Sequence, residues 1–320
     1  YSITVTLKRF DLDTSTTADD QLSGLQTIRV RATDEASNVQ DASISVDYAV
    51  GSVVQFVSTN GTYEVELFDV LTPNTVANFK SYLTDYSNSV IHRSVSSFVI
   101  QGGGYTLQNG VFEEVPEQTP ITNEFNSATS NIRGTLSMAL LGGQPDSGNS
   151  EWFINTVDNV PSLNTAGHTV FGRVIGQGMT VVDAINALSK FDLTDATNIS
   201  ALGEIPRQTT FVPLNTPLTG TVAVTSGSTT LTGTGTLFTQ ELTPRLLSPT
   251  DNPATRPARS YSRISINGQL FTVEQIISDT ELELSSTAAA DASGVLATTD
   301  QFVDDDFVKF SSISEILDTI

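Results

Sequence analysis

The stretch VIHRSVSSFVIQGGGYT, residues 90–106, sets a single arginine among apolar residues and ends beyond three consecutive glycines. An arginine next to a buried strand is usually a solvated charge at the rim of the protein. Arg93 alone would therefore carry no functional prediction. Two further stretches decide its interpretation, NIRGTLSMAL at 131–140 and NSEWFINTVDNVPSLNTAGHTVFGRV at 149–174.

The composition narrows the possible partners and cofactors. Fifteen Lys and Arg stand against 36 Asp and Glu, and the net charge of −21 would repel both a nucleic-acid backbone and an anionic membrane surface. With no cysteine and two histidines, thiolate and multi-histidine metal centres are not expected. The acidic runs DLDTSTTADD and FVDDDF could offer carboxylates to calcium, but solvated turns are the favoured interpretation. We predict no metal, no cofactor, no nucleic-acid partner and no membrane insertion.

Three units are expected from the 320 residues, since a domain usually takes roughly 100 to 200 residues. Residues 1–50 alternate apolar and polar residues in SITVTL, TIRVRA and ASISVDYAV, which is typical of half-buried strands. Three strands cannot close a sandwich alone. This N-terminal segment is therefore either the tail of an immunoglobulin-like domain or a set of strands completed from elsewhere. Its ATDEASNVQDASISV stretch is similar to the last hairpin of such domains in bacterial surface proteins.

The second unit, residues 51–215, is predicted to be mainly β. Two alternating runs meet at Asn60-Gly61, a strong hairpin signal. The period then changes in LTPNTVANFKSYL, where Thr72 can cap a helix and Pro73 suits its first turn, and a second helical pattern follows in MTVVDAINALSK. Short strands and glycine-rich turns lie between the two helices. This order predicts a closed antiparallel β-barrel capped by two helices and flanked by β-rich accessory segments.

The third unit, residues 216–320, is expected to be a small all-β domain with a hairpin at Asn267-Gly268. It resembles a β-module of tailed-phage virion proteins and bacterial surface proteins. Within it, a loop rich in proline carries or adjoins Arg245, Arg256, Arg259 and Arg263. On so acidic a chain, we expect this loop to dock on an acidic surface of a neighbouring domain or of a neighbouring subunit in a larger assembly.

Taken in order and spacing, the quoted stretches resemble the cyclophilin family of peptidyl-prolyl isomerases. The resemblance runs from about Val53 to Leu188 and includes VELFDVLTPNTVANF and GMTVVDAI. It implies an enzyme that acts on X-Pro bonds of proline-containing polypeptides. In such an enzyme a guanidinium donates to the prolyl nitrogen and stabilises the twisted amide more than the planar one.

The resemblance also implies the roles of single residues. Arg93 matches the catalytic arginine and Gln101 the glutamine that orients the substrate backbone. The substrate pocket is implied at Phe98, Val99, Ala139, Glu151, Phe153, Leu163 and His168. Without the surrounding motifs, the two phenylalanines would be read as plain core residues. His168 is expected to pack and to form hydrogen bonds only, and His92 to be structural.

Three positions depart from the family pattern. Val99 stands where many members have Met, Glu151 where most have Gln, and Ser162 where a tryptophan often precedes the pocket-wall leucine. An ionised glutamate accepts hydrogen bonds and cannot donate them, so Glu151 would repel a substrate carbonyl. If it also reaches Arg93, it would compete for the guanidinium. We therefore predict a slower or more selective isomerase than its relatives.

Two alternatives to the enzyme stay open. The first is a binding module whose altered pocket holds proline-containing segments with little turnover. The second is a structural module of a phage virion or surface filament. Because the chain begins at Tyr1, we expect a processed protein or a piece of a longer one. The accessory segments favour an exported protein, whether periplasmic, cell-surface or extracellular, or one associated with a virion.

Overall fold

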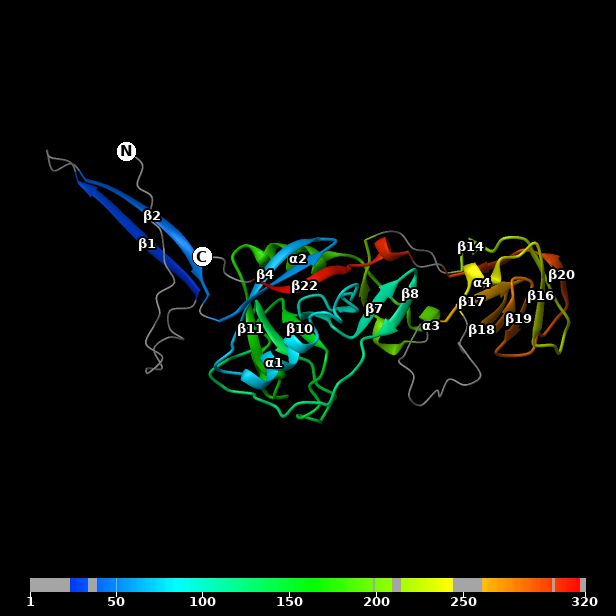
Figure 1. The fold of residues 1–320 in the computed structure, drawn as a ribbon, viewed down its shortest axis with the longest axis horizontal. Helices are drawn as coiled ribbons and strands as arrows, with labels where there is room; N and C mark the ends of the chain where they lie inside the picture. Colours follow the sequence, from blue (N-terminus) through cyan, green and yellow to red (C-terminus); the bar gives the residue numbers. More distant parts are fainter. Residues whose placement is uncertain are drawn as a thin grey trace.

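A computed structural model describes residues 24–33, 39–49, 51–197, 199–208, 214–243, 261–300 and 303–316. Two antiparallel sheets of eight strands dominate these residues, and each packs around its own hydrophobic core (Figure 1). A two-stranded ribbon extends from the first of them. The prediction of a mainly β protein with a cyclophilin-like barrel and two helices is confirmed.

The first sheet forms the barrel. Each strand is antiparallel to its neighbours, and the order across the sheet is β22 (Phe310–Ile316), β3 (Val53–Ser58), β4 (Gly61–Leu67), β11 (Val170–Ile175), β9 (Thr135–Met138), β10 (Trp152–Asn155), β6 (Val99–Gly102) and β5 (Arg93–Ser94). The expected hairpin at Asn60-Gly61 joins β3 to β4.

The barrel is closed by the end of the chain. Backbone hydrogen bonds run from Ile91 N to Val308 O at 3.0 Å and from Phe310 N to Ser89 O at 2.8 Å, while β22 pairs with β3 along its other side. Residues 303–316, including the short helix η4 (Asp304–Asp306), therefore pack with the first sheet and not with the second. The predicted domain boundaries, at residues 50/51 and 215/216, placed residues 303–316 in the third unit and not with the barrel.

The barrel core is aromatic. Phe56 stacks on Tyr63 with ring centroids 4.8 Å apart, and its ring meets the edge of Trp152 at 5.2 Å and of Phe310 at 5.8 Å. Phe79 reaches the same cluster from α1 (Pro73–Ser81), where the 3.6-residue period of the sequence places it beside Val76. Rings in such edge and stacked arrangements contribute packing beyond the area that they bury.

The two predicted helices are present, but one cap differs from the expectation. Helix α1 begins at Pro73, as predicted, yet the Thr72 hydroxyl donates to Phe68 O instead of capping the helix. The backbone N–H groups of Asn74 and Thr75 are bound by the Glu124 carboxylate at 3.1 and 2.7 Å. A carboxylate at this end also suits the helix dipole. Helix α2 (Gly178–Ala187) packs against the barrel through Val182 and Ile185.

A smaller layer lies beside β5, the last strand of the first sheet. It consists of the hairpin β7 (Tyr105–Gln108) and β8 (Val111–Glu114), the pair β12 (Lys190–Phe191) and β13 (Ile205–Pro206), and the short helices α3 (Thr194–Thr197) and η3 (Ser200–Leu202). Leu193, Leu202, Ile205 and Phe307 form its fully buried core with residues of the hairpin. This layer holds residues 190–208 against the edge of the barrel.

The second sheet is built from residues 214–300, with α4 (Phe238–Glu241) packed on it. Its strand order is β14 (Thr216–Pro217), β21 (Ala297–Thr299), β17 (Arg263–Ile266), β18 (Gln269–Ser278), β19 (Glu281–Leu284), β16 (Thr230–Thr234), β15 (Thr221–Val224) and β20 (Ala292–Val295). The expected turn joins β17 to β18, and Asn267 and Gly268 both have positive φ, at 49° and 79°. Most of the predicted proline loop lies outside the described residues, and of its four arginines only Arg263 is described.

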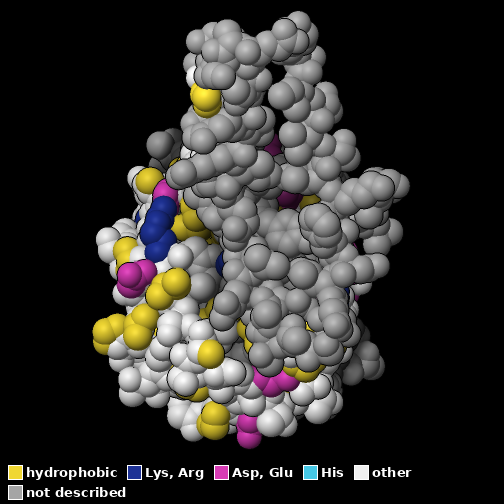
Figure 2. Space-filling view, turned by 90° about the vertical axis from the view of Figure 1, so that its left-hand side faces the viewer, with side chains coloured by type: hydrophobic (Ala, Val, Ile, Leu, Met, Phe, Trp, Pro, Cys, Tyr) yellow, Lys and Arg dark blue, Asp and Glu magenta, His cyan; other side chains and the backbone are white. Residues whose placement is uncertain are grey.

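Strands β1 (Gly24–Thr33) and β2 (Val39–Tyr48) form the ribbon, paired in register from Gly24↔Tyr48 to Thr33↔Val39. The predicted strand SITVTL lies outside the described residues. In the described part of the side that carries the ribbon, hydrophobic, basic and acidic side chains lie among other polar ones (Figure 2). Figure 1 shows the ribbon leading away from the barrel.

Closure of the barrel by residues 303–316 predicts a large effect of Phe310→Ala. The ring is fully buried and lies 5.9 Å from Trp152, so its loss should lower the free energy of unfolding by about 3 to 5 kcal/mol. Urea unfolding followed by fluorescence of Trp152, the single tryptophan, would measure it. Leu296→Ala, at a side chain 65% exposed on the second unit, should change the same quantity by no more than about 0.5 kcal/mol. A loss below about 1 kcal/mol for Phe310→Ala would contradict the assignment of β22 to the barrel.

Candidate active site

Strands β6 and β10 present their two faces to different surroundings. Ile100 and Ile154 pair across the strands and lie fully buried in the barrel core. Val99, Gln101 and Phe153 alternate with them and so lie on the opposite face. The site on this outer face is therefore built on strands that the core holds rigid.

Five of the predicted site residues form one apolar cluster on the outer face. Val99, Phe153 and Leu163 are buried, and Phe98 and Ala139 are partly exposed and pack against them. Leu163 comes from the single-turn π-helix at Val160–Asn164, and the others come from β6, β10 and the end of β9 or its flanks. Two aromatic rings and three aliphatic side chains thus form one apolar cluster, the candidate substrate pocket.

His168 lies at the edge of this pocket. Its ring meets Phe153 edge to face at a centroid distance of 5.2 Å, and its Nδ1 is 3.0 Å from the Met138 carbonyl oxygen. These contacts are packing and hydrogen bonding, which agrees with the limited role expected for His168.

Arg93 begins a line of polar contacts along the pocket. It lies on β5 directly opposite Gln101 on β6, and its Nη1 donates to Gln101 Oε1 at 3.5 Å. The other end of the same amide, Nε2, donates to Glu151 Oε2 at 2.6 Å. Arg93 Nε also lies 3.4 Å from an oxygen of Glu204, a residue that the sequence did not single out.

Glu151 is engaged away from Arg93. Its Oε2 lies 3.5 Å from Nε2 of the buried His92, and among the described residues no ion pair joins it to Arg93. Glu151 therefore does not compete directly for the Arg93 guanidinium. Among the described contacts, it is connected to the guanidinium only through Gln101. Gln101 stands between the two groups because it lies opposite both Arg93 on β5 and Phe153 on β10.

The surroundings of Glu151 favour its ionised form. Burial would raise the pKa of this carboxyl, but the charge of His92 and hydrogen bonds from His92 and Gln101 leave the pKa below its ordinary value. Glu151 is thus an acceptor at neutral pH, which fixes the Gln101 amide with its N–H toward Glu151 and its oxygen toward Arg93. Burial, with nearby Glu114 and Glu151, raises the pKa of Tyr105 to about 12, so the tyrosine ring beside His92 stays neutral.

Close packing requires glycine at positions 102–104. A Cβ on Gly103 would lie 2.4 Å from Ser150 O, and the backbone there has a φ of +83°. A Cβ on Gly104 would lie 2.6 Å from Glu151 Oε1. Trp152, whose role the sequence left open, packs its buried indole against Gly102 and Gly103. The glycines therefore let β10 and Glu151 approach the backbone beyond β6.

A buried amide network below the pocket was missed from the sequence. Asn159 Nδ2 donates to the Phe98 carbonyl at 2.9 Å and to Asn155 Oδ1 at 2.8 Å, and Asn155 Nδ2 donates to Asn131 Oδ1 at 3.2 Å. The network fixes the backbone at Phe98 and the start of the turn that carries Leu163. The sequence held a signal for this network, because all three asparagines lie within the stretches that carry the family resemblance.

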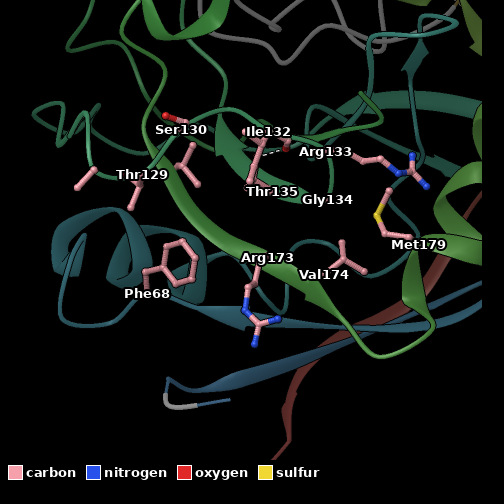
Figure 3. A pocket seen from close by; sticks show the side chains of 12 residues that line it. Phe68, Thr129, Ser130, Ile132, Arg133, Gly134, Thr135, Arg173, Val174 and Met179 are labelled. Carbon is pink, nitrogen blue, oxygen red and sulfur yellow. Dashed lines mark hydrogen bonds between the residues drawn. The ribbon is translucent and has the colours of Figure 1, made fainter. Parts of the chain in front are cut away.

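A separate cavity of about 500 Å³ lies elsewhere on the barrel (Figure 3). Ile132 and Arg133 line one wall, Arg173 and Val174 the other, and none of the predicted site residues takes part. Within the described ranges, no three His, Asp or Glu side chains are grouped as metal ligands. No helix of these ranges is long and apolar enough to cross a membrane.

Comparisons with known proteins agree on one family. The family model described as cyclophilin type peptidyl-prolyl cis-trans isomerase/CLD matches residues 53–203. A peptidyl-prolyl cis-trans isomerase of Acinetobacter baylyi is 38% identical over 147 residues, which cover 44% of this chain and 76% of that protein. Peptidyl-prolyl cis-trans isomerase B of Escherichia coli is 37% identical over 145 residues, covering 43% and 85%.

Among solved structures, the chain is similar to a cyclophilin type peptidyl-prolyl cis-trans isomerase of Cryptosporidium parvum, crystallised in the presence of the dipeptide Ala-Pro. The identity is 23%, the match covers 43% of this chain and 87% of that one, and the TM-score is 0.37. The match to the family model includes Arg93 and the candidate pocket, and it ends one residue before Glu204.

Burial and His92 shift the pKa of Glu151 in opposite directions, so the loss of His92 should raise this pKa. In His92→Leu the imidazole is lost, so burial should prevail and raise the pKa of the Glu151 carboxyl above its ordinary value of about 4.3. A carboxyl NMR titration would measure it. In the unchanged protein the lowered pKa stabilises the fold at neutral pH, and this contribution is lost as the pH falls through the folded-state pKa. An unchanged pKa in His92→Leu would contradict the role given to His92.

Proposed function

The chain belongs to the cyclophilin-type peptidyl-prolyl cis-trans isomerases and is an enzyme of that class. From this premise we propose that the apolar cluster around Phe153 binds the proline ring of a polypeptide and that Arg93 catalyses rotation of the preceding X-Pro bond. The observation that carries the proposal is the placement of a guanidinium and a glutamine beside a pocket formed by five apolar residues.

The proposed chemistry follows from the electronic structure of the amide. Rotation costs roughly 18 to 20 kcal/mol because the nitrogen shares its lone pair with the carbonyl. In the twisted state that lone pair is localised and can accept a hydrogen bond from Arg93. A donor that binds the twisted nitrogen more strongly than the planar one accelerates the rotation.

A site of this kind can supply the transition-state stabilisation that fast X-Pro rotation requires. Unaided exchange takes about 10 to 100 s, and a turnover of order 10² to 10³ per second needs about 5 to 7 kcal/mol of differential stabilisation. A charged donor supplies part of it, since hydrogen bonds from ionised groups are roughly twice as strong as neutral ones. Enclosure of the ring by Phe98, Phe153 and Leu163 supplies orientation and excludes water.

We also propose that this enzyme is slower or more selective than its relatives, because Glu151 binds the side-chain amide of Gln101. The amide N–H of Gln101 is bound to the carboxylate at 2.6 Å and is not free to donate to a substrate carbonyl. Its oxygen is then turned toward Arg93, where it accepts a guanidinium N–H that could otherwise serve the substrate. Glu151 thus acts on Arg93 through Gln101.

The setting of the enzyme is proposed on the accessory segments. The resemblance of residues 1–50 to surface-protein domains and of the third unit to virion modules supports an exported or virion-associated protein. A second candidate function, a binding or structural module with little turnover, is favoured by the same Glu151 contact, since a pocket can hold proline while its arginine is partly occupied. Measured turnover separates the two.

Arg93→Ala should lower kcat/KM by at least about a hundredfold, which corresponds to about 2.7 kcal/mol of transition-state stabilisation. Arg93→Lys is the matched variant, because it keeps the charge but loses the planar fork of donors. NMR exchange or a protease-coupled assay on X-Pro peptides would measure the rates, and Trp152 fluorescence would show that the barrel is intact. An unchanged rate in Arg93→Ala would remove the enzyme mechanism proposed for this site.

Glu151→Gln should raise kcat/KM by about three- to thirtyfold, or roughly 0.7 to 2 kcal/mol, because a neutral amide no longer holds Gln101 by a charge-assisted bond. The same assay on several X-Pro peptides would measure it. Glu281→Gln, which removes one exposed carboxylate from the second sheet, should leave the rate unchanged. Equal or lower activity of Glu151→Gln on all peptides would refute this account of reduced activity.

A further inference from the structure

Glu204 reaches Arg93 from outside the barrel. It lies between η3 and β13, where its carbonyl accepts the backbone N–H of Ser94 at 2.8 Å. On either side of it, Leu202 and Ile205 are fully buried in the layer that packs beside β5. The backbone of Glu204 is therefore fixed next to the strand that carries Arg93.

The guanidinium is held on two of its nitrogens. Glu204 Oε2 lies 3.4 Å from Nε, and Gln101 Oε1 lies 3.5 Å from Nη1. The described contacts leave Nη2 without a protein partner. Contacts at Nε and Nη1 narrow the directions in which the planar fork can point its remaining N–H groups, whereas a free arginine side chain samples many rotamers.

We propose that Glu204 is a positioning residue of this enzyme, which holds the Arg93 guanidinium in the orientation that the reaction needs. The inference rests on the proposed catalytic function of Arg93. Both side chains are partly exposed, 37% for Arg93 and 48% for Glu204, so the pair contributes little to stability and its charge is screened by solvent. The restraint on geometry is not screened, and catalysis is sensitive to it.

The same contact could instead weaken the enzyme by neutralising the guanidinium, and substitutions separate the two effects. Glu204→Gln removes the charge but keeps an oxygen that can accept from Nε. Glu204→Ala removes both. Orientation predicts that only the alanine variant is impaired, whereas neutralisation predicts that both variants are faster.

The test is steady-state isomerase kinetics on the full chain. We expect Glu204→Ala to lower kcat by about three- to tenfold with KM unchanged, and Glu204→Gln to retain the rate within about twofold. The matched control is Glu315→Ala, which removes another partly exposed carboxylate from an ion pair, that with Lys80 at 3.1 Å. It should leave kcat unchanged. In an Arg93→Lys background, Glu204→Ala should have no further effect.

Three results would overturn the proposal: a higher kcat in both Glu204 variants, an equal loss in both, or a lowered melting temperature of Glu204→Ala with kcat unchanged. Failure of the underlying function would look different, because the unchanged protein would then lack isomerase activity or keep it in Arg93→Ala. Activity that depends on Arg93 but not on Glu204 would reject this inference alone.

Discussion

The alternation of side chains along β6 and β10 is the constraint on which the rest of the site depends. Each strand sends every second residue into the barrel core and the others to the outer face. A shift of one residue in this pairing would exchange Ile100 with Gln101 and destroy core and pocket together. The register is protected by the glycines beyond β6, where Trp152 and Glu151 pack so closely on the backbone that no side chain could be accommodated. The rigid core thereby supports the residues of the candidate pocket on the outer face.

The sequence predicted what is local or carried by a contiguous motif. Both Asn-Gly hairpins, the two helices and the apolar residues of the pocket belong to this class, because period, turn chemistry and family spacing act within a few residues. Contacts made across long separations were not predicted. Glu124 caps α1 from 50 residues away, and the strand that closes the barrel includes Ser311, which bonds to Val57 at a separation of 254 residues. The sequence pattern of neither segment indicates which distant residues it contacts.

The return of the chain gives the second sheet its place in the architecture. Residues 214–300 leave and re-enter beside each other, since Gln208 N donates to Asp306 O at 2.8 Å and Arg207 bridges Phe307. The second unit is therefore inserted between the layer that carries Glu204 and the strand that closes the barrel. An added unit can be tolerated at such a point because its two ends are already held together by the barrel.

Arg93 lies where three parts of the chain meet, and each part supplies a different constraint. The barrel core fixes β6 and with it Gln101, the β10 edge supplies Glu151, and the layer of residues 190–208 supplies Glu204. Neither carboxylate binds the tip of the guanidinium in a bidentate pair, which would occupy the donors that the proposed mechanism uses. One acts through an amide and the other on Nε. Glu204 thus contacts the arginine directly at Nε, Glu151 is connected to it through the Gln101 amide, and Nη2 stays free of described protein contacts.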